Sequence, residues 1–215
     1  MATVLFDVNE TLLSLAPVTT EVDDLLGAGT TPLWFARLLH ASLVMNHVGL
    51  RASFEEVGAA ELQRVAASRG LEVDHDRAVA ISAGLRRLPA HDDVMPGLAS
   101  LRAAGHRLVA FTNGASDAVA DQLAHAGIDR EFDQVVSVDG GPTFKPDAGA
   151  YRAAAAQVGE HGSALTMVAA HDWDIAGARS AGWHTVFVQR DGPTWWLPLP
   201  PGPTVSTIGD VGQYL

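Results

Sequence analysis

The residues best suited to chemistry follow short apolar runs, and the first set follows the run that ends at Phe6. Asp7, Asn9 and Thr11 come directly after that run. Open α/β sheets bind ligands at the carboxyl edge of their strands, so Asp7 is a candidate nucleophile at such an edge. Asn9 stands two residues later, and an amide cannot donate a proton as a carboxylic acid does. Asp7 is therefore predicted to attack a bond whose leaving group needs no proton.

Three further sets of polar residues follow later apolar runs in the same way. They are Thr112 and Asn113, then Lys145, and finally His171, Trp173 and Asp174. A single polar loop residue is usually only solvated. Four sets at successive strand ends instead predict one convergent site.

The elements that must position these residues alternate between apolar runs and helical patterns. Strands are predicted at 2–6, 107–111, 134–138, 165–170 and 185–188, with an edge strand at 204–206. Helices are predicted at 96–104, 116–126, 148–158 and 175–181, and they end at Gly105, Gly127, Gly159 and Gly182. This alternation predicts an α/β fold, a doubly wound parallel sheet with helices on both faces. Asp174 would also cap the helix that begins at Ile175.

Residues 15–88 interrupt this alternation, because they contain no strong strand pattern. Helical patterns occur there at 33–48, 54–68 and 77–88. We expect residues 15–88 to form an all-helical cap inserted into a core made of residues 1–14 and 89–215. The segment 192–203 is rich in proline and tryptophan and is expected to wrap the surface, where Trp195 and Trp196 cover a sheet edge or a partner subunit.

The composition excludes several classes of protein. The 215 residues carry a net charge of −11 and contain no cysteine, which argues against a nucleic-acid partner and excludes disulfides and zinc–thiolate sites. No apolar run approaches the roughly 20 residues that a membrane helix needs, and no basic segment marks a signal peptide. The nine histidines show no metal-site spacing. We expect a cytoplasmic protein that acts on a small molecule, without a metal, a cofactor or a membrane.

The order of these motifs resembles the haloacid dehalogenase superfamily of hydrolases. The resemblance rests on the Asp7 strand end, on Thr112-Asn113-Gly114, on Lys145-Pro146-Asp147 and on the late Asp174. Residues 132–139 and the pair Trp173-Asp174 are similar to the 2-haloacid dehalogenases in particular. The resemblance implies a Rossmann-like core with an inserted helical cap, and dehalogenases of this type are often homodimers.

The resemblance also implies a role for each motif. Asp7 would form a covalent aspartyl ester with the substrate, and Lys145 would neutralise the nucleophile's charge. Thr112 would bind the acidic group of the substrate, and Asn113 would face the departing halide. Asp174 would position or activate the hydrolytic water. The remaining pocket residues are Asn9, Thr11, His171 and Trp173, and Trp173 would form a wall of the halide site.

Two positions favour a dehalogenase over the phosphatases of the same superfamily. Asn9 replaces the aspartic acid that protonates a leaving alkoxide, and Ala170 replaces the aspartate that holds magnesium four residues before Asp174. A halide leaves without a proton, so carbon–halogen chemistry tolerates both losses. We therefore predict the metal-independent conversion of a small 2-haloacid to a 2-hydroxy acid.

Several departures from the family pattern keep alternatives open. Asn9-Glu10 replaces a Tyr-Gly pair, and Phe35 stands where the halide-binding arginine of the cap is expected, with Arg37 on another face of that helix. His171 replaces an asparagine, and it is either a general base or a structural histidine. The alternatives are a magnesium-dependent phosphatase that recruits Asp172 or Asp174, and a catalytically degenerate binding module.

Overall fold

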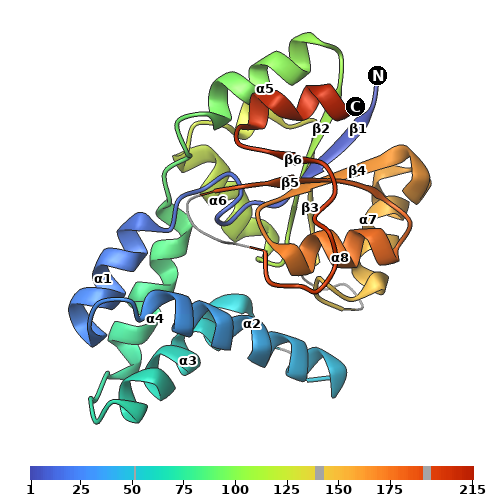
Figure 1. Cartoon of the computed structure of the whole chain (residues 1–215). Helices are drawn as coiled ribbons and strands as arrows, with labels where there is room; N and C mark the ends of the chain where they lie inside the picture. The colour runs from blue at the N-terminus through green and yellow to red at the C-terminus, as the bar shows by residue number, and fades with distance from the viewer. Residues whose placement is uncertain (51, 139–142, 191–194) are drawn as a thin grey trace. The chain divides into compact units, whose positions relative to one another are not determined.

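The computed structural model describes residues 1–50, 52–138, 143–190 and 195–215. It divides into two compact units, a core unit of Met1–Ser14 and Pro89–Leu215 and a helical unit of Leu15–Leu88 (Figure 1). Asp139, the last residue of the 132–139 motif, and residues 192–194 of the proline-rich segment lie outside the described residues. No helix of the described residues is both long enough and apolar enough to cross a membrane.

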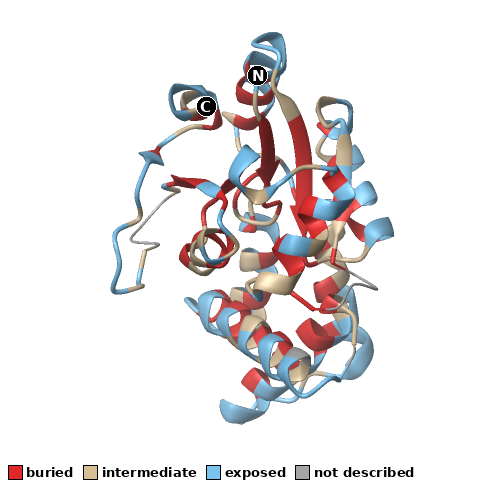
Figure 2. Ribbon diagram, turned by 90° about the vertical axis from the view of Figure 1, so that its right-hand side faces the viewer, coloured by how far each residue is buried: buried red, intermediate tan, exposed pale blue. Residues whose placement is uncertain are grey.

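The core unit is built on a six-stranded sheet in which every neighbouring pair is parallel. Its order is β3-β2-β1-β4-β5-β6. The strands are β1 (Thr3–Phe6), β2 (Arg107–Thr112), β3 (Gln134–Ser137), β4 (Leu165–Ala169), β5 (His184–Val188) and β6 (Thr204–Val205). The central strands β1 and β4 are buried along their whole length, which is why they appear in the sequence as continuous apolar runs (Figure 2). The predicted doubly wound α/β fold is confirmed.

Helices cover both faces of this sheet. They are α5 (Val94–Ala103), α6 (Ser116–His125), α7 (Ala148–Val158) and α8 (Asp172–Ser180), with a 3₁₀ segment η4 (Ile208–Tyr214) near the C-terminus. Figure 1 shows α5 and η4 on one side of the sheet and α7 and α8 on the other. The face under α7 and α8 is packed by buried aromatic side chains, and Phe111, Tyr151 and Trp183 lie with ring centroids 5.5–6.1 Å apart.

The start of α8 differs from the sequence prediction in a way that affects the site. The backbone N–H of Ile175 donates to the carbonyl of His171 over 3.2 Å, so the first turn closes on His171 and the helix begins at Asp172. Asp174 therefore lies inside the first turn and is not the N-cap that the sequence suggested. The four glycines predicted to end helices all have left-handed backbones, with φ between 70° and 84°, as expected.

The described residues of the helical unit form four α-helices, one more than the sequence predicted. They are α1 (Ala16–Leu26), α2 (Thr31–His47), α3 (Phe54–Ser68) and α4 (His75–Ala83), followed by the 3₁₀ turn η1 (Gly84–Arg87). Pro17 lies in the first turn of α1, where a missing N–H costs nothing. The buried Trp34 joins α2 to α3, because its Nε1 donates to the carbonyl of Gly58 over 2.8 Å.

The two tryptophans after the undescribed segment behave differently from each other. Trp195 packs edge-on against Phe187 of β5 at 5.2 Å, and its Nε1 donates to the carbonyls of Leu197 and Leu199. Trp196 is 75% exposed. Trp195 therefore covers β5, whereas Trp196 does not.

Candidate active site

Asp7 lies at the carboxyl edge of the sheet, immediately after β1. Its backbone N–H donates to the carbonyl of Val168 over 3.0 Å, which extends the pairing of β1 with β4 by one residue. The carboxylate is 5% exposed. A buried charge is stable only where other groups compensate it, and the partners of Asp7 define the site.

Lys145 is the first of these partners, and it is the only lysine of the chain. Its fully buried Nζ donates to Asp7 Oδ1 over 2.8 Å, to Asp174 Oδ2 over 2.6 Å and to the carbonyl of Phe111 over 3.0 Å. An ammonium group has three donors, so all of them are used. Lys145 thus joins the two predicted catalytic carboxylates, as the strand-end pattern implied.

Asn113 fixes the backbone that carries this lysine. Its Oδ1 accepts from the N–H of Lys145 over 2.8 Å, and its Nδ2 donates to the carbonyl of Lys145 over 3.2 Å. The neighbouring Thr112 accepts the N–H of Gly114 over 3.0 Å through its hydroxyl oxygen. Both residues therefore order the strand end, and each keeps one side-chain N–H or O–H that has no acceptor among the described residues.

Asp174 is held from its other side by Tyr151, a residue that the sequence did not single out. The tyrosine hydroxyl lies 2.5 Å from Asp174 Oδ1, so each oxygen of this carboxylate has a donor. Burial and the charge of Asp7 raise the pKa of Asp174, while Lys145 acts in the opposite direction. Burial likewise raises the pKa of Tyr151 well above its ordinary value, so its hydroxyl stays a donor.

We predict that Gly177→Ala disturbs this arrangement. A Cβ at Gly177 would lie 2.5 Å from the Tyr151 hydroxyl oxygen and 2.6 Å from its ring, and that ring is fully buried. We expect a loss of about 1–3 kcal/mol in the free energy of unfolding, together with a lower catalytic rate. The matched control is Gly209→Ala, where the nearest atoms are 3.8 Å away. Equal urea midpoints for the two variants would contradict the prediction.

The second oxygen of Asp7 is bound by Thr11 and His171. Thr11 Oγ1 donates to Asp7 Oδ2 over 2.8 Å, and His171 Nδ1 lies 2.9 Å from the same oxygen. His171 Nε2 lies 2.8 Å from Glu10 Oε2, and Trp173 stacks on the imidazole at 4.9 Å. Glu10 was noted only as a departure from the family pattern, yet it is a direct partner of a predicted site residue.

These contacts set the charges of the site. Burial opposes the ionisation of Asp7, but the Lys145 ammonium and the His171 ring hold the pKa of Asp7 well below its usual range. Burial also opposes a charge on His171, but the hydrogen bonds to Asp7 and Glu10 raise the pKa of His171 to about 10. At neutral pH the nucleophile candidate is therefore a carboxylate between two cations.

Two residues point away from this cluster. Asn9 Oδ1 accepts from Gln122 of α6 over 2.9 Å. Asp172 accepts the backbone N–H groups of Trp173, Trp196 and Leu197 at 2.7–3.1 Å, so its carboxylate holds the C-terminal segment. Within the described part of the chain, no group of three or more histidine, aspartate or glutamate side chains has the arrangement of a metal site. The geometry gives no support to a magnesium site built on Asp172.

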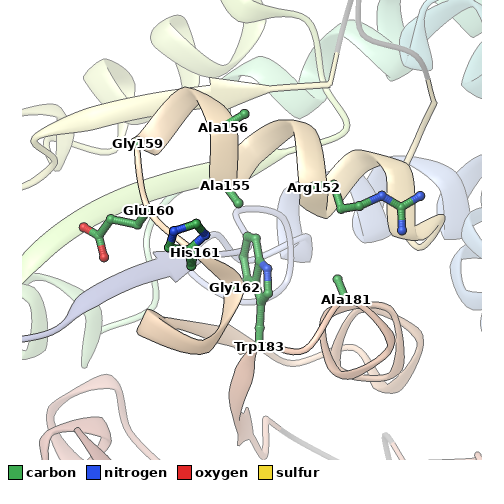
Figure 3. Close-up of a pocket in the computed structure, with 9 residues that line it drawn as sticks. All are labelled: Arg152, Ala155, Ala156, Gly159, Glu160, His161, Gly162, Ala181 and Trp183. Carbon is green, nitrogen blue, oxygen red and sulfur yellow. The ribbon is translucent and has the colours of Figure 1, made fainter.

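A separate hollow of about 420 Å³ lies on the core unit (Figure 3). Gly159 and Gly162 line it just before β4 begins, so it belongs to the amino edge of the sheet. Arg152, His161 and Trp183 also line it. None of the residues around Asp7 reaches this hollow.

The comparison with family models agrees with the fold and the cluster. Residues 1–182 match the model of the haloacid dehalogenase-like hydrolases, and the chain belongs to this family of hydrolases. Among curated relatives, the haloacetate dehalogenase H-2 of Moraxella sp. (strain B) is 26% identical over 166 residues, 77% of this chain and 74% of the relative. The (S)-2-haloacid dehalogenase of Pseudomonas sp. (strain YL) is 26% identical over 190 residues, 87% of this chain and 82% of the relative.

Solved structures share the fold. The L-2-haloacid dehalogenase from Xanthobacter autotrophicus with chloropropionic acid covalently bound has a TM-score of 0.89 at 23% identity, over 99% of this chain and 97% of that one. The hydrolase YfnB from Bacillus subtilis, solved with magnesium, has a TM-score of 0.77 at 16% identity, over 99% and 97%. The fold therefore occurs in a protein solved with magnesium as well as in dehalogenases, and the side chains must indicate the chemistry.

Proposed function

We propose that this hydrolase is a 2-haloacid dehalogenase that converts a small 2-haloacid to a 2-hydroxy acid and halide through an aspartyl ester on Asp7, without a metal ion. The observation that carries this proposal is the pair of cations on the Asp7 carboxylate, Lys145 on Oδ1 and His171 on Oδ2. They supply from the protein the positive charge that a phosphatase takes from a metal. The dehalogenase relatives support the same chemistry.

In the first step one oxygen of Asp7 attacks the carbon that bears the halogen. Oδ2 already accepts from Thr11 and His171, whereas Lys145 is the one donor to Oδ1 among the described residues. A carboxylate oxygen has two lone pairs in the plane, so Oδ1 keeps one for the attack. The halide leaves as an anion and needs no acid, which agrees with the amide at position 9.

In the second step water attacks the carboxyl carbon of the ester. With Oδ1 in the ester link, the negative charge of the tetrahedral intermediate develops on Oδ2. Thr11 already points its hydroxyl at this oxygen, so it supplies a preorganised donor for the developing charge. Asp174 and Tyr151 keep Lys145 in place, and the second oxygen of the intermediate stays beside its ammonium group.

The remaining residues are assigned to the substrate pocket. Thr112 offers its hydroxyl to the substrate carboxylate, Asn113 offers its second amide N–H to the halide, and Trp173 supplies an apolar wall. Residues 15–88 would act as the cap. Arg37 is engaged within that unit by Glu61 at 3.1 Å, so we assign it no halide-binding role. We also expect the protein to be cytoplasmic and to form a homodimer. Light scattering would test the homodimer.

A substrate panel tests this function against its alternatives. Halide release from chloroacetate, bromoacetate, fluoroacetate and 2-chloropropionate is measured in EDTA, and phosphate release from simple esters is measured with Mg²⁺. We expect halide release that survives chelation, and no phosphate release. Metal-dependent phosphate release would show a phosphatase instead, and silence with every substrate would favour a binding module.

A further inference from the structure

Glu10 and His171 form a pair that the two-step reaction above uses only in part. Glu10 has a left-handed backbone with a φ of 59°, the only non-glycine residue in this region among those described. Such a conformation costs about 1 kcal/mol or more for a residue with a side chain. Two further bonds hold the residue there. Its N–H donates to the carbonyl of Leu13 over 2.8 Å, and its own carbonyl lies 3.2 Å from His91 Nε2.

This backbone directs the Glu10 carboxylate at His171. The chain of contacts runs from Asp7 Oδ2 to Nδ1 over 2.9 Å, and from Nε2 to Glu10 Oε2 over 2.8 Å. Trp173 stacks on the ring and fixes its plane. A nucleophile, an imidazole and an orienting carboxylate in this order form the arrangement in which the carboxylate sets the tautomer and the imidazole transfers the proton.

We propose that His171, oriented by Glu10, is the general base that activates water to hydrolyse the ester on Asp7. This inference rests on the proposed function, because it concerns the second half of the same reaction. His171 is then a catalytic residue, and Glu10 is a positioning residue that acts through it.

The competing base is Asp174, and its surroundings argue against that role. Its side chain is completely buried, one oxygen is bound by Lys145 at 2.6 Å and the other by Tyr151 at 2.5 Å. The His171 side chain is 13% exposed, so water can reach it. Asp174 therefore holds Lys145, and the imidazole is the accessible base beside the ester.

The position of His171 also excludes a role as the acid that assists halide departure. In a displacement at carbon the leaving group departs on the side opposite to the attacking oxygen. His171 contacts the attacking carboxylate itself. It lies on the nucleophile side of the reacting carbon, where it serves only the second step.

His171 both takes and returns the proton that ester hydrolysis requires. After the ester forms, His171 releases one proton to solvent and keeps the hydrogen on Nε2 that Glu10 accepts. Nδ1 then takes a proton from water while the water oxygen bonds to the Asp7 carboxyl carbon. The C–O bond from that carbon to the substrate oxygen breaks, and Nδ1 returns the proton to the leaving alkoxide. Asp7, left as a carboxylic acid, gives its proton to Nδ1 and restores the starting state.

The charges around the His171 ring favour the loss of its proton after the ester has formed, and not before. In the free enzyme His171 faces the carboxylates of Asp7 and Glu10, with Lys145 beyond Asp7, and the pKa of His171 is raised to about 10. Esterification removes the charge of Asp7, while burial continues to lower the pKa of His171. The base therefore becomes available when the ester exists.

Single-turnover measurements on His171→Gln test the proposal. With bromoacetate we expect one equivalent of bromide per enzyme, an ester on Asp7 in the intact-mass spectrum, and a steady-state rate lowered by about 10²–10⁴-fold. Asp174→Asn is the comparison, and it should accumulate no ester. Normal turnover by His171→Gln, or loss of its first bromide, would overturn the proposal. Silence of the wild type with every haloacid would instead reject the proposed function itself.

Glu10→Gln supplies a second readout that does not depend on the folding of the histidine variant. Removing this negative charge lowers the pKa of His171, so the rise of ester hydrolysis with pH should move to lower pH and reach a lower plateau. If Glu10 had only a structural role, Glu10→Gln would lower the rate of ester hydrolysis and leave the pH midpoint of that rate unchanged. An unchanged midpoint would overturn the assignment of Glu10.

Discussion

Asp7→Asn is expected to abolish halide release, with kcat/KM lowered by about 10⁴-fold or more, as is typical when a nucleophile is removed. The amide keeps the shape of the side chain but loses the charge that attacks carbon. Lys145 and His171 would also lose the anion that they share. Steady-state halide release from 2-chloropropionate measures the effect.

The matched control is Asp92→Asn in the same unit. Asp92 is exposed and its side chain makes no hydrogen bond or ion pair with the described residues, so its loss should leave the rate within about twofold of wild type, as for an ordinary surface change. If Asp7→Asn kept more than a small fraction of the activity, another residue would have to be the nucleophile.

Lys145→Met should be the most destabilising single change at the site. Methionine keeps the volume of the stem but leaves the carboxylates of Asp7 and Asp174 buried without their shared cation. Breaking a buried ion pair from one side costs about 3–5 kcal/mol, so we expect a loss of that size at neutral pH together with loss of activity. Chemical denaturation followed by circular dichroism gives the free energy.

The loss in the free energy of unfolding of Lys145→Met should depend on pH in a defined direction. Burial already raises the pKa of Asp174, and without Lys145 it rises further above its unfolded value near 4, so the folded state is penalised above that pH and the penalty fades as Asp174 becomes protonated. The control is Arg77→Met, whose partner Glu21 lies 3.5 Å away with both side chains about half exposed. That change should cost less than about 1 kcal/mol. A pH-independent loss for Lys145→Met would contradict the burial of uncompensated charge.

The centre of the sheet could be predicted from the sequence because β1 and β4 are buried along their whole length. Such strands leave uninterrupted apolar runs, and each predicted core strand lies within one residue of the observed one at both ends. Helix α7 was predicted with its observed bounds, since Gly159 ends it in a left-handed conformation. Helix α1 was missed, although Pro17 lies in its first turn, where proline is common.

The site was predictable where the topology alone brings residues together. Parallel strands end at one edge, and this places Asp7 and Asp174 within hydrogen-bonding distance of Lys145. Tyr151 could not be found in this way, because it reaches Asp174 from the middle of α7. A signal for Lys145 was available in the composition, since a single lysine in a chain with 13 arginines is not placed for surface charge.

Glu10 escaped prediction for a different reason. Its contact with His171 depends on a left-handed backbone that a side-chain-bearing residue rarely adopts, and no sequence pattern announces that conformation. The two departures from the family pattern, at positions 10 and 171, are therefore a contacting pair, and only the folded structure shows this.

The central claim is that the Asp7 carboxylate, and not water, first bonds to the substrate carbon. A single turnover in ¹⁸O-labelled water, with enzyme in excess over 2-chloropropionate, tests it directly. We predict that the lactate formed carries unlabelled oxygen at carbon 2, and that the label appears in the peptide containing Asp7. Labelled oxygen in the lactate of the first turnover, with an unlabelled Asp7 peptide, would contradict the account.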